Sequence, residues 1–294
     1  MWCSAWPSTP RAAQAWLGEA IAIKDPTSAV FRPQSGSNLL ILGQQDEAAL
    51  GIMSTALVSL AAHYPLQSVP SEPPPARFYI FDGTPVDSPR SGFLARLVEV
   101  LPHPVQSVGW RELPAVINEI ATEVERRQAE VGSESNAIYL LVHDLQRFRE
   151  LRKAEDDFSF SRSGEDEKPN PAKQFASILR EGPVVGVHTL VWCDTLNNLN
   201  RTLDRQGMRE FEMRVLFQMS SNDSSNLIDS PMANKLGAYR ALYFSEEQGR
   251  LEKFRPYGSP PPEWVEQVRA QFQRNSLPAP SQELGQDVPS LHGT

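Results

Sequence analysis

The chain has 294 residues, of which 40% are hydrophobic and 22% are charged, so its composition is that of a globular protein rather than a disordered or fibrous one. This length suits one domain of about 230 to 250 residues with irregular ends. The net charge of −8 argues against a broad electrostatic grip on DNA or on anionic lipid, although a local basic patch remains compatible with it.

The positions of the cysteines and the length of the apolar runs indicate the cellular compartment of the chain. Cys3 and Cys193 lie far apart in the sequence, and we expect both to be free thiols in a reducing environment. No apolar run approaches the roughly 20 residues that cross a bilayer, and no signal peptide is recognisable. The segment from Met1 to Pro7 resembles the cut end of a longer protein. We therefore expect a cytoplasmic domain, and tethering to a membrane through the rest of a longer protein is left open.

The first predicted elements lead up to Gly43. Residues 1–19 are expected to form a linker or N-terminal extension. Residues 21–31 alternate around an Asp-Pro turn and predict an antiparallel hairpin. The apolar run Leu39–Leu42 predicts a buried strand that enters Gly43, and a helical pattern extends from about Asp46 to about His63.

The rest of the chain alternates buried strands with helices, which predicts an α/β fold with a mostly parallel central sheet flanked by helices and with peripheral β-hairpins. We expect one domain over residues 20–256, with a charged surface insertion at about 150–170. A C-terminal helix at 257–274 and a disordered tail at 275–294 are expected to follow. The elements predicted after residue 70 are a loop at 70–75, strands at 77–83, 137–144, 186–193 and 213–219, helices at 112–130, 172–181 and 263–273, and a hairpin of 240–244 with 250–255.

A buried strand, a glycine turn and a helix that opens directly from the turn form the frame of a phosphate-binding loop. If Gly43 is the first glycine of the motif G-x-x-x-x-G-K-[ST], the second glycine falls on Ala48, the lysine on Ala49 and the hydroxyl residue on Leu50. Carboxylates stand where backbone amides would meet phosphate. We name this segment the relic loop, and it consists of Gly43, Gln44, Gln45, Asp46, Glu47, Ala48, Ala49 and Leu50.

Several further segments resemble one family in their order and spacing. The strand Phe78–Gly83 ends in an acidic turn, and Glu123-Val-Glu-Arg-Arg127 lies within a helix. Gly182–Trp192 leads into a strand that contains a histidine, and the segment from Arg214 to Leu236 is the nearest match. Together these segments resemble the motor modules of the FtsK/SpoIIIE family of RecA-like ATPases over roughly residues 20–256. The resemblance implies a RecA-like P-loop NTPase fold, binding of ATP and magnesium, and the context of DNA translocases and type VII secretion ATPases.

The chain departs from the family pattern where the nucleotide would be handled. The loop has neither the lysine nor the hydroxyl residue. The family's Asp-Glu pair, which holds magnesium and activates water, reads His143-Asp144 here, or Asp144-Leu145 in a shifted alignment. The Thr-Gln pair after the fourth strand becomes Asp194-Thr195. We therefore expect no cofactor and no metal: the family uses ATP and magnesium, and the substitutions predict that both are lost.

Coulomb's law gives the size of the repulsion between these carboxylates and a bound phosphate. A carboxylate about 4 Å from a phosphate oxygen repels it by roughly 4 kcal/mol at an effective dielectric constant of about 20. Asp46 or Glu47 alone would then weaken ATP binding about a thousandfold. The same carboxylates are favourable in the first turn of a helix, by roughly 0.3 to 1 kcal/mol. We hypothesise that they take the place of phosphate and hold the relic loop in an empty form.

Other residues have alternative interpretations. His143 is either a metal ligand or, as we favour, a hydrogen-bonded structural residue, and His188 is expected to be a satisfied core histidine. Cys193 is expected to be buried and not to act as a nucleophile. Arg214 is either an arginine finger for a neighbouring subunit or, as we favour, an ion pair at a strand edge. A compact basic cluster is expected to be a solvated face, with a nucleic-acid or partner contact as the alternative, and it consists of Arg147, Arg149, Arg152 and Lys153.

We predict a catalytically inactive FtsK/SpoIIIE-type module of a larger multi-domain translocase, which serves assembly, regulation or docking of a partner or cargo. The alternative is an active DNA-translocating ATPase that binds ATP and DNA and whose catalytic residues are completed across a subunit interface. A third hypothesis is a module that recognises a peptide signal near the relic loop. The expected partners are neighbouring ATPase modules of the same or a partner chain and a peptide or protein cargo. DNA is left open without support from the net charge, and direct membrane insertion is not expected.

Overall fold

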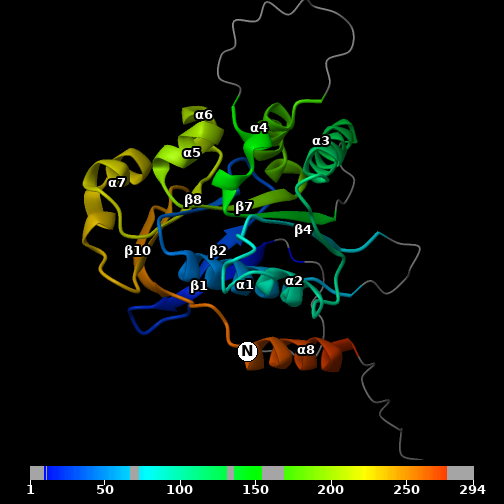
Figure 1. The fold of residues 1–294 in the computed structure, drawn as a ribbon, viewed down its shortest axis with the longest axis horizontal. Coiled ribbons are helices and arrows are strands. Elements are labelled where there is room, and N and C mark those ends of the chain that lie inside the picture. Colours follow the sequence, from blue (N-terminus) through cyan, green and yellow to red (C-terminus); the bar gives the residue numbers. More distant parts are fainter. Residues whose placement is uncertain (1–9, 11, 67–72, 131–135, 154–168, 277–294) are drawn as a thin grey trace, which may run out of the picture.

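The computed structural model describes residue 10 and residues 12–66, 73–130, 136–153 and 169–276. Within these residues one sheet has the strand order β2-β1-β10-β9-β8-β3-β7-β6-β4-β5 (Figure 1). The strands from β8 to β5 in this order pair in parallel, and those from β2 to β8 pair antiparallel. The strands are β1 (Ala13–Ala20), β2 (Thr27–Phe31), β3 (Leu39–Leu42), β4 (Ala76–Asp82), β5 (Val105–Ser107), β6 (Ala137–His143), β7 (Val187–Cys193), β8 (Met213–Leu216), β9 (Ala241–Ser245) and β10 (Arg250–Pro256).

Helices cover both faces of this sheet and divide the core into two apolar layers. One layer contains α1, α2 and α8, and the other contains α3, α4, α5 and α7 on the opposite face (Figure 1). No helix in the described residues combines the length and the apolar character that crossing a membrane requires. The helices are α1 (Asp46–His63), α2 (Phe93–Val98), α3 (Leu113–Ala129), α4 (Pro171–Glu181), α5 (Leu196–Thr202), α6 (Arg205–Arg209), α7 (Ser221–Ile228) and α8 (Pro262–Ser276), with 3-10 turns at Leu145–Arg147, Arg149–Leu151, Pro183–Val185 and Pro231–Lys235.

The predicted α/β fold is confirmed, with a parallel central sheet, flanking helices and antiparallel hairpins at one side. The strand before the relic loop and the helix that begins within it have the predicted bounds, Leu39–Leu42 and Asp46–His63. Because the central strands are parallel, the carboxyl ends of β3, β7 and β6 lie at one edge of the sheet. This edge is where α/β sheets place ligands, and the relic loop lies there.

The N-terminal region differs from the prediction. The first arm of the hairpin is β1 (Ala13–Ala20), which lies inside the segment expected to be a linker except for Ala20, and residues 21–25 belong to the turn that leads to β2. Ala13, Ala15 and Leu17 are buried and alternate with exposed residues, which is the period of a strand. The prediction missed this strand because small alanines give a weak hydrophobic signal at alternate positions.

The remaining boundaries differ less. Strand β8 ends at Leu216 rather than at Met219, and α8 extends to Ser276, into the expected tail. Helices α2, α5, α6 and α7 and strand β5 have no counterpart in the prediction. The predictions for residues 1–9, for most of the charged insertion (154–168) and for the tail beyond 276 lie outside the described residues, as does Cys3.

A buried carboxylate holds the turn between β1 and β2. Glu252 on β10 is 9% exposed and accepts a hydrogen bond from Thr27 Oγ1 at 2.5 Å. Its other carboxylate oxygen forms ion pairs with Lys24 Nζ at 2.8 Å and with Arg250. Burial alone would raise the pKa of Glu252, but the hydrogen bonds from Lys24, Thr27 and Arg250 outweigh it and hold this pKa below its usual range.

Glu252→Gln is expected to lower the free energy of unfolding by about 2 kcal/mol near neutral pH, because hydrogen bonds to a charged group are lost. A carboxylate with a lowered folded-state pKa stabilises the fold above the unfolded-state pKa of about 4.3, and this stabilisation disappears as the pH falls through the folded-state pKa. Urea unfolding at a series of pH values should therefore show a smaller acid-dependent loss in Glu252→Gln than in the wild type.

Glu19→Gln is the matched control, because Glu19 is an exposed carboxylate 3.8 Å from Arg255. Exposed pairs of this kind contribute little, so the stability of this variant should follow that of the wild type at every pH. Equal acid dependence in Glu252→Gln and the wild type would contradict the role assigned to the buried carboxylate.

Candidate functional site

The relic loop consists of the turn after β3 and the first residues of α1, and contacts with β7 hold its start in place. Gly43 has a φ of +129°, a conformation that side chains rarely allow, and a Cβ there would lie 2.7 Å from Phe217 Cβ. The Gly43 amide donates to Cys193 O at 3.1 Å, and Trp192 Nε1 donates to Gly43 O at 3.1 Å. Both backbone conformation and packing therefore require glycine at this position.

Helix α1 begins at Asp46, two residues before the position of the motif's second glycine at Ala48. Ala49 N–H donates to Gln45 O at 2.9 Å, and the helix already includes Asp46 and Glu47. Ala49 and Leu50, at the positions of the motif's lysine and hydroxyl residue, are 0% and 1% exposed and belong to the apolar layer between α1 and the sheet. The relic loop therefore presents neither an ammonium group nor a hydroxyl group from these positions.

The two carboxylates at the start of α1 have different surroundings. Asp46 Oδ1 accepts the Glu47 N–H at 2.9 Å, which satisfies one of the amides that the first turn of a helix leaves free. Arg90, between β4 and α2, forms an ion pair with Asp46 at 3.0 Å and donates a second hydrogen bond at 3.2 Å. Arg90 therefore offsets part of the Asp46 charge, and the repulsion expected for a phosphate falls mainly to Glu47. Arg90 could not be identified from the sequence, because nothing in its local pattern indicates this long-range pairing.

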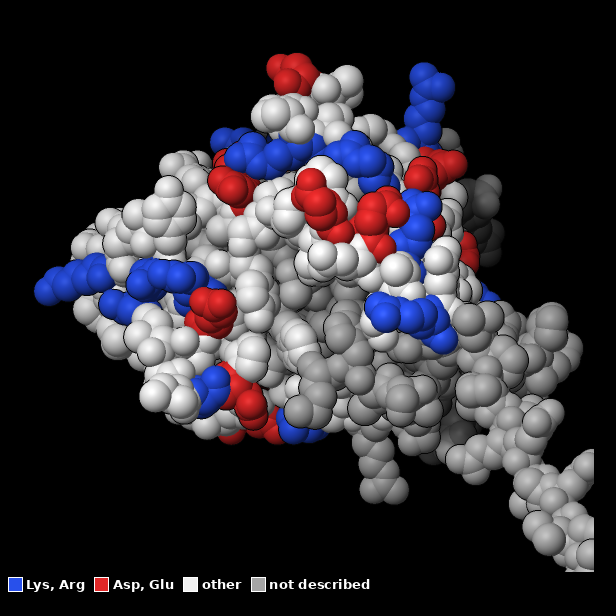
Figure 2. Space-filling view, turned by 90° about the horizontal axis from the view of Figure 1, so that it is seen from below, with Lys and Arg blue, Asp and Glu red and all other residues white. Residues whose placement is uncertain are grey.

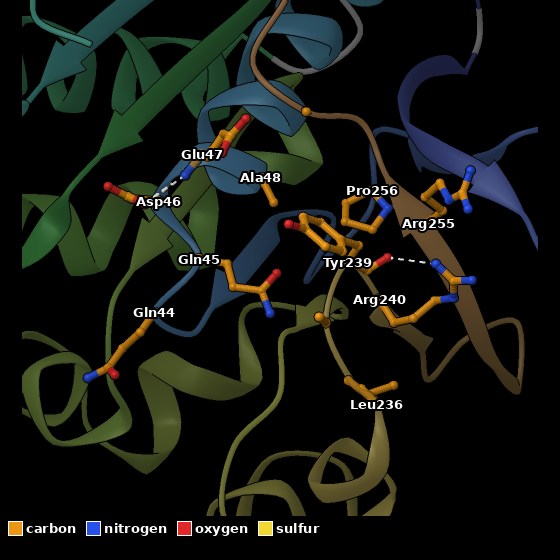
Figure 3. Close-up of a pocket in the computed structure, with 12 residues that line it drawn as sticks. Gln44, Gln45, Asp46, Glu47, Ala48, Leu236, Tyr239, Arg240, Arg255 and Pro256 are labelled. Carbon is orange, nitrogen blue, oxygen red and sulfur yellow. Dashed lines mark hydrogen bonds between the residues drawn. The ribbon is translucent and has the colours of Figure 1, made fainter. Parts of the chain in front are cut away.

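A cavity of about 940 Å³ opens in front of the relic loop (Figure 3). The relic loop from Gln44 to Ala48 forms one wall. The other wall comes from the segment before β9 and from the end of β10. Tyr239 is 78% exposed and has a φ of +56°, and its carbonyl oxygen accepts a hydrogen bond from Arg240 Nη1 at 3.0 Å. We name this cavity the loop pocket, and its residues outside the relic loop are Leu236, Ala238, Tyr239, Arg240, Arg255, Pro256 and Gly258.

His143 ends β6 and is 4% exposed. Its Nδ1 lies 3.5 Å from Asp82 Oδ1 and 3.3 Å from Thr84 Oγ1, and its ring centroid lies 4.6 Å from that of Trp192. Burial alone would raise the pKa of Asp82, but hydrogen bonds from His143 and Thr84 outweigh it and lower this pKa. These contacts agree with the structural interpretation of His143. The described residues contain no group of three or more His, Cys, Asp or Glu side chains arranged to hold a metal ion.

Asp144 follows β6 in a left-handed conformation, with a φ of +68°. One carboxylate oxygen accepts a hydrogen bond from Arg147 Nε at 2.6 Å, and the other accepts one from Gln146 Nε2. Burial raises the pKa of Asp144, and the hydrogen bond from Arg147 opposes this shift. Both oxygens are therefore engaged by the turn that follows Asp144 in the chain.

The guanidinium of Arg214 is held by main-chain carbonyl groups. Its Nε donates to Phe211 O at 2.9 Å, its Nη2 donates to Met208 O at 3.1 Å, and its Nη1 donates to Leu227 O. Burial lowers the pKa of Arg214. Arg214 therefore joins β8 to the ends of α6 and α7, and its partners are carbonyl oxygens where we had favoured a carboxylate. A role as an arginine finger stays a prediction.

His188 and Cys193 lie in the core, as predicted. His188 Nδ1 lies 2.8 Å from Ser37 O, and burial lowers the pKa of this histidine to about 4. Cys193 is 0% exposed, and burial raises the pKa of its thiol to about 12, so it is not an activated nucleophile.

Three of the four residues of the basic cluster form hydrogen bonds or ion pairs within the chain. Arg147 pairs with Asp144, Arg152 Nη2 donates to Gln146 O at 2.6 Å, and Lys153 Nζ donates to Leu203 O at 3.2 Å. These contacts hold the turn after β6, where we had expected a solvated face. A nucleic-acid or partner contact stays a prediction.

The central parallel strands, the helices on both faces of the sheet and the glycine turn between β3 and α1 form a fold that this chain shares with solved ATPase structures. Among solved structures, the EssC chain with ATPases 2 and 3 from Geobacillus thermodenitrificans is 15% identical, with a TM-score of 0.60, over 92% of this chain and 49% of that chain. The pCW3 conjugation coupling protein TcpA, in monomer form with ATPγS, is 10% identical, with a TM-score of 0.59, over 91% of this chain and 75% of that chain.

The Thermomonospora curvata EccC chain with ATPases 2 and 3, in complex with a signal sequence peptide, is 13% identical, with a TM-score of 0.58, over 91% of this chain and 47% of that chain. This chain therefore spans about half the length of the EssC and EccC chains. These similarities confirm the fold implied by the resemblance to FtsK/SpoIIIE-family modules. No family model matches the chain, and no curated protein matches it.

Proposed function

We propose that this chain is a catalytically inactive ATPase-fold module of the FtsK/SpoIIIE type, acting in the cytoplasm within a larger translocase. It would supply a docking surface for neighbouring modules or for a protein cargo. The fold shared with EssC, EccC and TcpA supports the translocase setting. The EssC and EccC chains each contain two ATPase modules, and this chain covers about half of each.

The observation that carries the proposal is the burial of Ala49 and Leu50. Their side chains occupy the positions of the phosphate-binding lysine and the magnesium-binding hydroxyl residue, and both are packed into the core. Phosphoryl transfer depends on positioning and charge stabilisation, which these two groups supply in active P-loop ATPases. Glu47 adds a negative charge to the lining of the loop pocket.

Titration calorimetry of the chain with ATP and magnesium is expected to show no binding tighter than about 100 µM. Glu47→Gln is the matched variant, because it removes the carboxylate and leaves the lysine and hydroxyl positions unchanged. We expect this variant to bind weakly too, since the main attractive groups remain absent. Tight binding by the wild type would overturn the proposal, and tight binding by Glu47→Gln alone would show that the carboxylate is the main obstacle.

The competing function is an active DNA-translocating ATPase completed across a subunit interface. It requires ATP hydrolysis that rises with added DNA and with protein concentration and that is lost in Arg214→Ala. We expect no such turnover, because the Arg214 guanidinium is engaged by three carbonyl groups of its own chain. Turnover that follows all three criteria would favour the active enzyme.

A further inference from the structure

Gly51 is a buried residue in the interior of α1. Glycine weakens the interior of a helix relative to alanine, because its backbone loses more conformational freedom on folding. A Cβ at Gly51 would overlap with the carbonyl oxygens of Tyr257 and Gly258. The absence of a side chain at Gly51 therefore lets the main chain that follows β10 lie directly against the helix.

The segment that crosses α1 at this point also forms part of the loop pocket. We name it the strap, and it consists of Pro256, Tyr257 and Gly258. Pro256 and Gly258 line the loop pocket. The Tyr257 N–H donates to Leu17 O at 3.1 Å, so β1 holds the strap as well. The strap is therefore a wall of the pocket and, at the same time, a segment packed on α1.

Helix α8 follows the strap in the chain and lies below α1 and α2 in Figure 1. Val265, Val268 and Phe272 are 9%, 2% and 2% exposed and belong to the apolar layer that contains α1. Their spacing of three and four residues places them on one face of the helix. An apolar stripe therefore docks α8 onto the body of the protein.

The ion pair and the hydrogen bond found between side chains of α8 join residues of this helix to one another. Arg269 Nε lies 3.6 Å from Glu266, and Arg274 donates to Gln271 Oε1 at 2.8 Å. Figure 2 views the molecule from below, the side on which α8 lies, and among the described residues acidic and basic side chains are interspersed there. Exposed pairs contribute little, so we expect the apolar stripe to decide whether α8 stays docked.

A stiff connection joins the strap to α8. It consists of Ser259, Pro260 and Pro261, and α8 begins with a further proline, Pro262. Proline fixes its own φ and disfavours the helical conformation in the residue before it. Proline-rich linkers therefore act as semi-rigid spacers. A movement of the strap would be passed on to α8, because the connection between them cannot easily absorb it.

We propose that the strap couples the loop pocket to α8, so that displacement of the strap from Gly51 releases α8 from α1. Release uncovers the apolar side chains that α8 buries, and it follows from any movement of this wall of the pocket. Such a coupling is reciprocal, so loosening α8 also loosens the strap. The inference goes beyond the proposed function and does not depend on whether the pocket binds ATP.

Hydrogen exchange of the full chain, followed by mass spectrometry, tests the coupling in Gly51→Ala. The added methyl group does not fit beneath the strap, so we expect the amides of the strap and of α8 to exchange about tenfold faster or more, while those of β6 stay protected. Gly207→Ala in α6 is the matched control, because a Cβ there would lie 3.4 Å from its nearest neighbours. Faster exchange in the strap with an unchanged α8 would overturn the inference.

Val268→Ser tests the coupling from the other end and decides the question if Gly51→Ala does not fold. It weakens the apolar stripe and leaves the strap sequence intact, so the strap amides should exchange about threefold faster or more. Val86→Ser is the matched control, because Val86 is 93% exposed. A strap that stays fully protected while α8 exchanges faster would rule out the coupling. The ATP titration enters neither comparison, so failure of this coupling is distinguishable from failure of the proposed function.

Discussion

Asn38→Ala is expected to lower the free energy of unfolding by about 4 kcal/mol, because it leaves several buried main-chain groups without partners. Asn38 is 0% exposed and immediately precedes β3. Its Nδ2 donates to Leu179 O at 2.9 Å and to Glu210 O at 2.8 Å, and its Oδ1 accepts the Thr189 N–H at 2.8 Å. One amide therefore joins the entry of β3 to α4, to the end of α6 and to β7.

Urea unfolding followed by circular dichroism measures the loss. Asn234→Ala is the matched control, because Asn234 is exposed and its amide donates to Ser221 Oγ at 2.8 Å on the surface. We expect this control to change stability by no more than about 0.5 kcal/mol. A loss below about 1 kcal/mol in Asn38→Ala would mean that water satisfies the main-chain groups that bond to Asn38 in the wild type. The Asn38 amide would then not be a structural junction.

The sequence predicted the central elements well, because their patterns are local and long. The apolar run Leu39–Leu42 and the helical pattern from Asp46 to His63 each carry enough periodicity to define an element without tertiary information. Strand β1 was missed because alanines occupy two of its inward positions, and α6, at Arg205–Arg209, is too short to show a period.

Only part of the candidate site could be predicted from the sequence. The relic loop follows from the spacing of Gly43, Ala49 and Leu50 alone. The opposite wall, from Leu236 to Arg240, and the offsetting of Asp46 by Arg90 depend on how distant segments pack, and no local pattern encodes either. The repulsion of a phosphate by Asp46 is therefore weaker than expected from the sequence, because this carboxylate already pairs with Arg90.

The Glu-Val-Glu-Arg-Arg segment was identified through a resemblance, and the structure supplies its physical role. Arg127 has a side chain that is 6% exposed, and its Nε pairs with Glu123 Oε1 at 2.7 Å. Its Nη1 donates to Asn136 O at 2.7 Å and to Val185 O at 3.0 Å. Arg127 thus fastens the end of α3 to the segments that enter β6 and β7.

Arg127→Ala is expected to cost about 3 kcal/mol of unfolding free energy, because it leaves the carbonyl oxygens of Asn136 and Val185 without this buried donor and removes one of the two partners of the partly exposed Glu123 carboxylate. Arg127→Lys should recover only a part, since an ammonium cannot reproduce the fork of guanidinium donors. Arg126→Ala is the matched control: Arg126 is its exposed neighbour and pairs with Glu123 and Glu130 at the surface, so no measurable change is expected.

Equal losses of stability in Arg126→Ala and Arg127→Ala would show that the surface ion pairs, rather than the buried carbonyl contacts, stabilise this segment. Hydrogen exchange at the start of β6 separates the two explanations, because protection there should fall in Arg127→Ala and persist in Arg126→Ala.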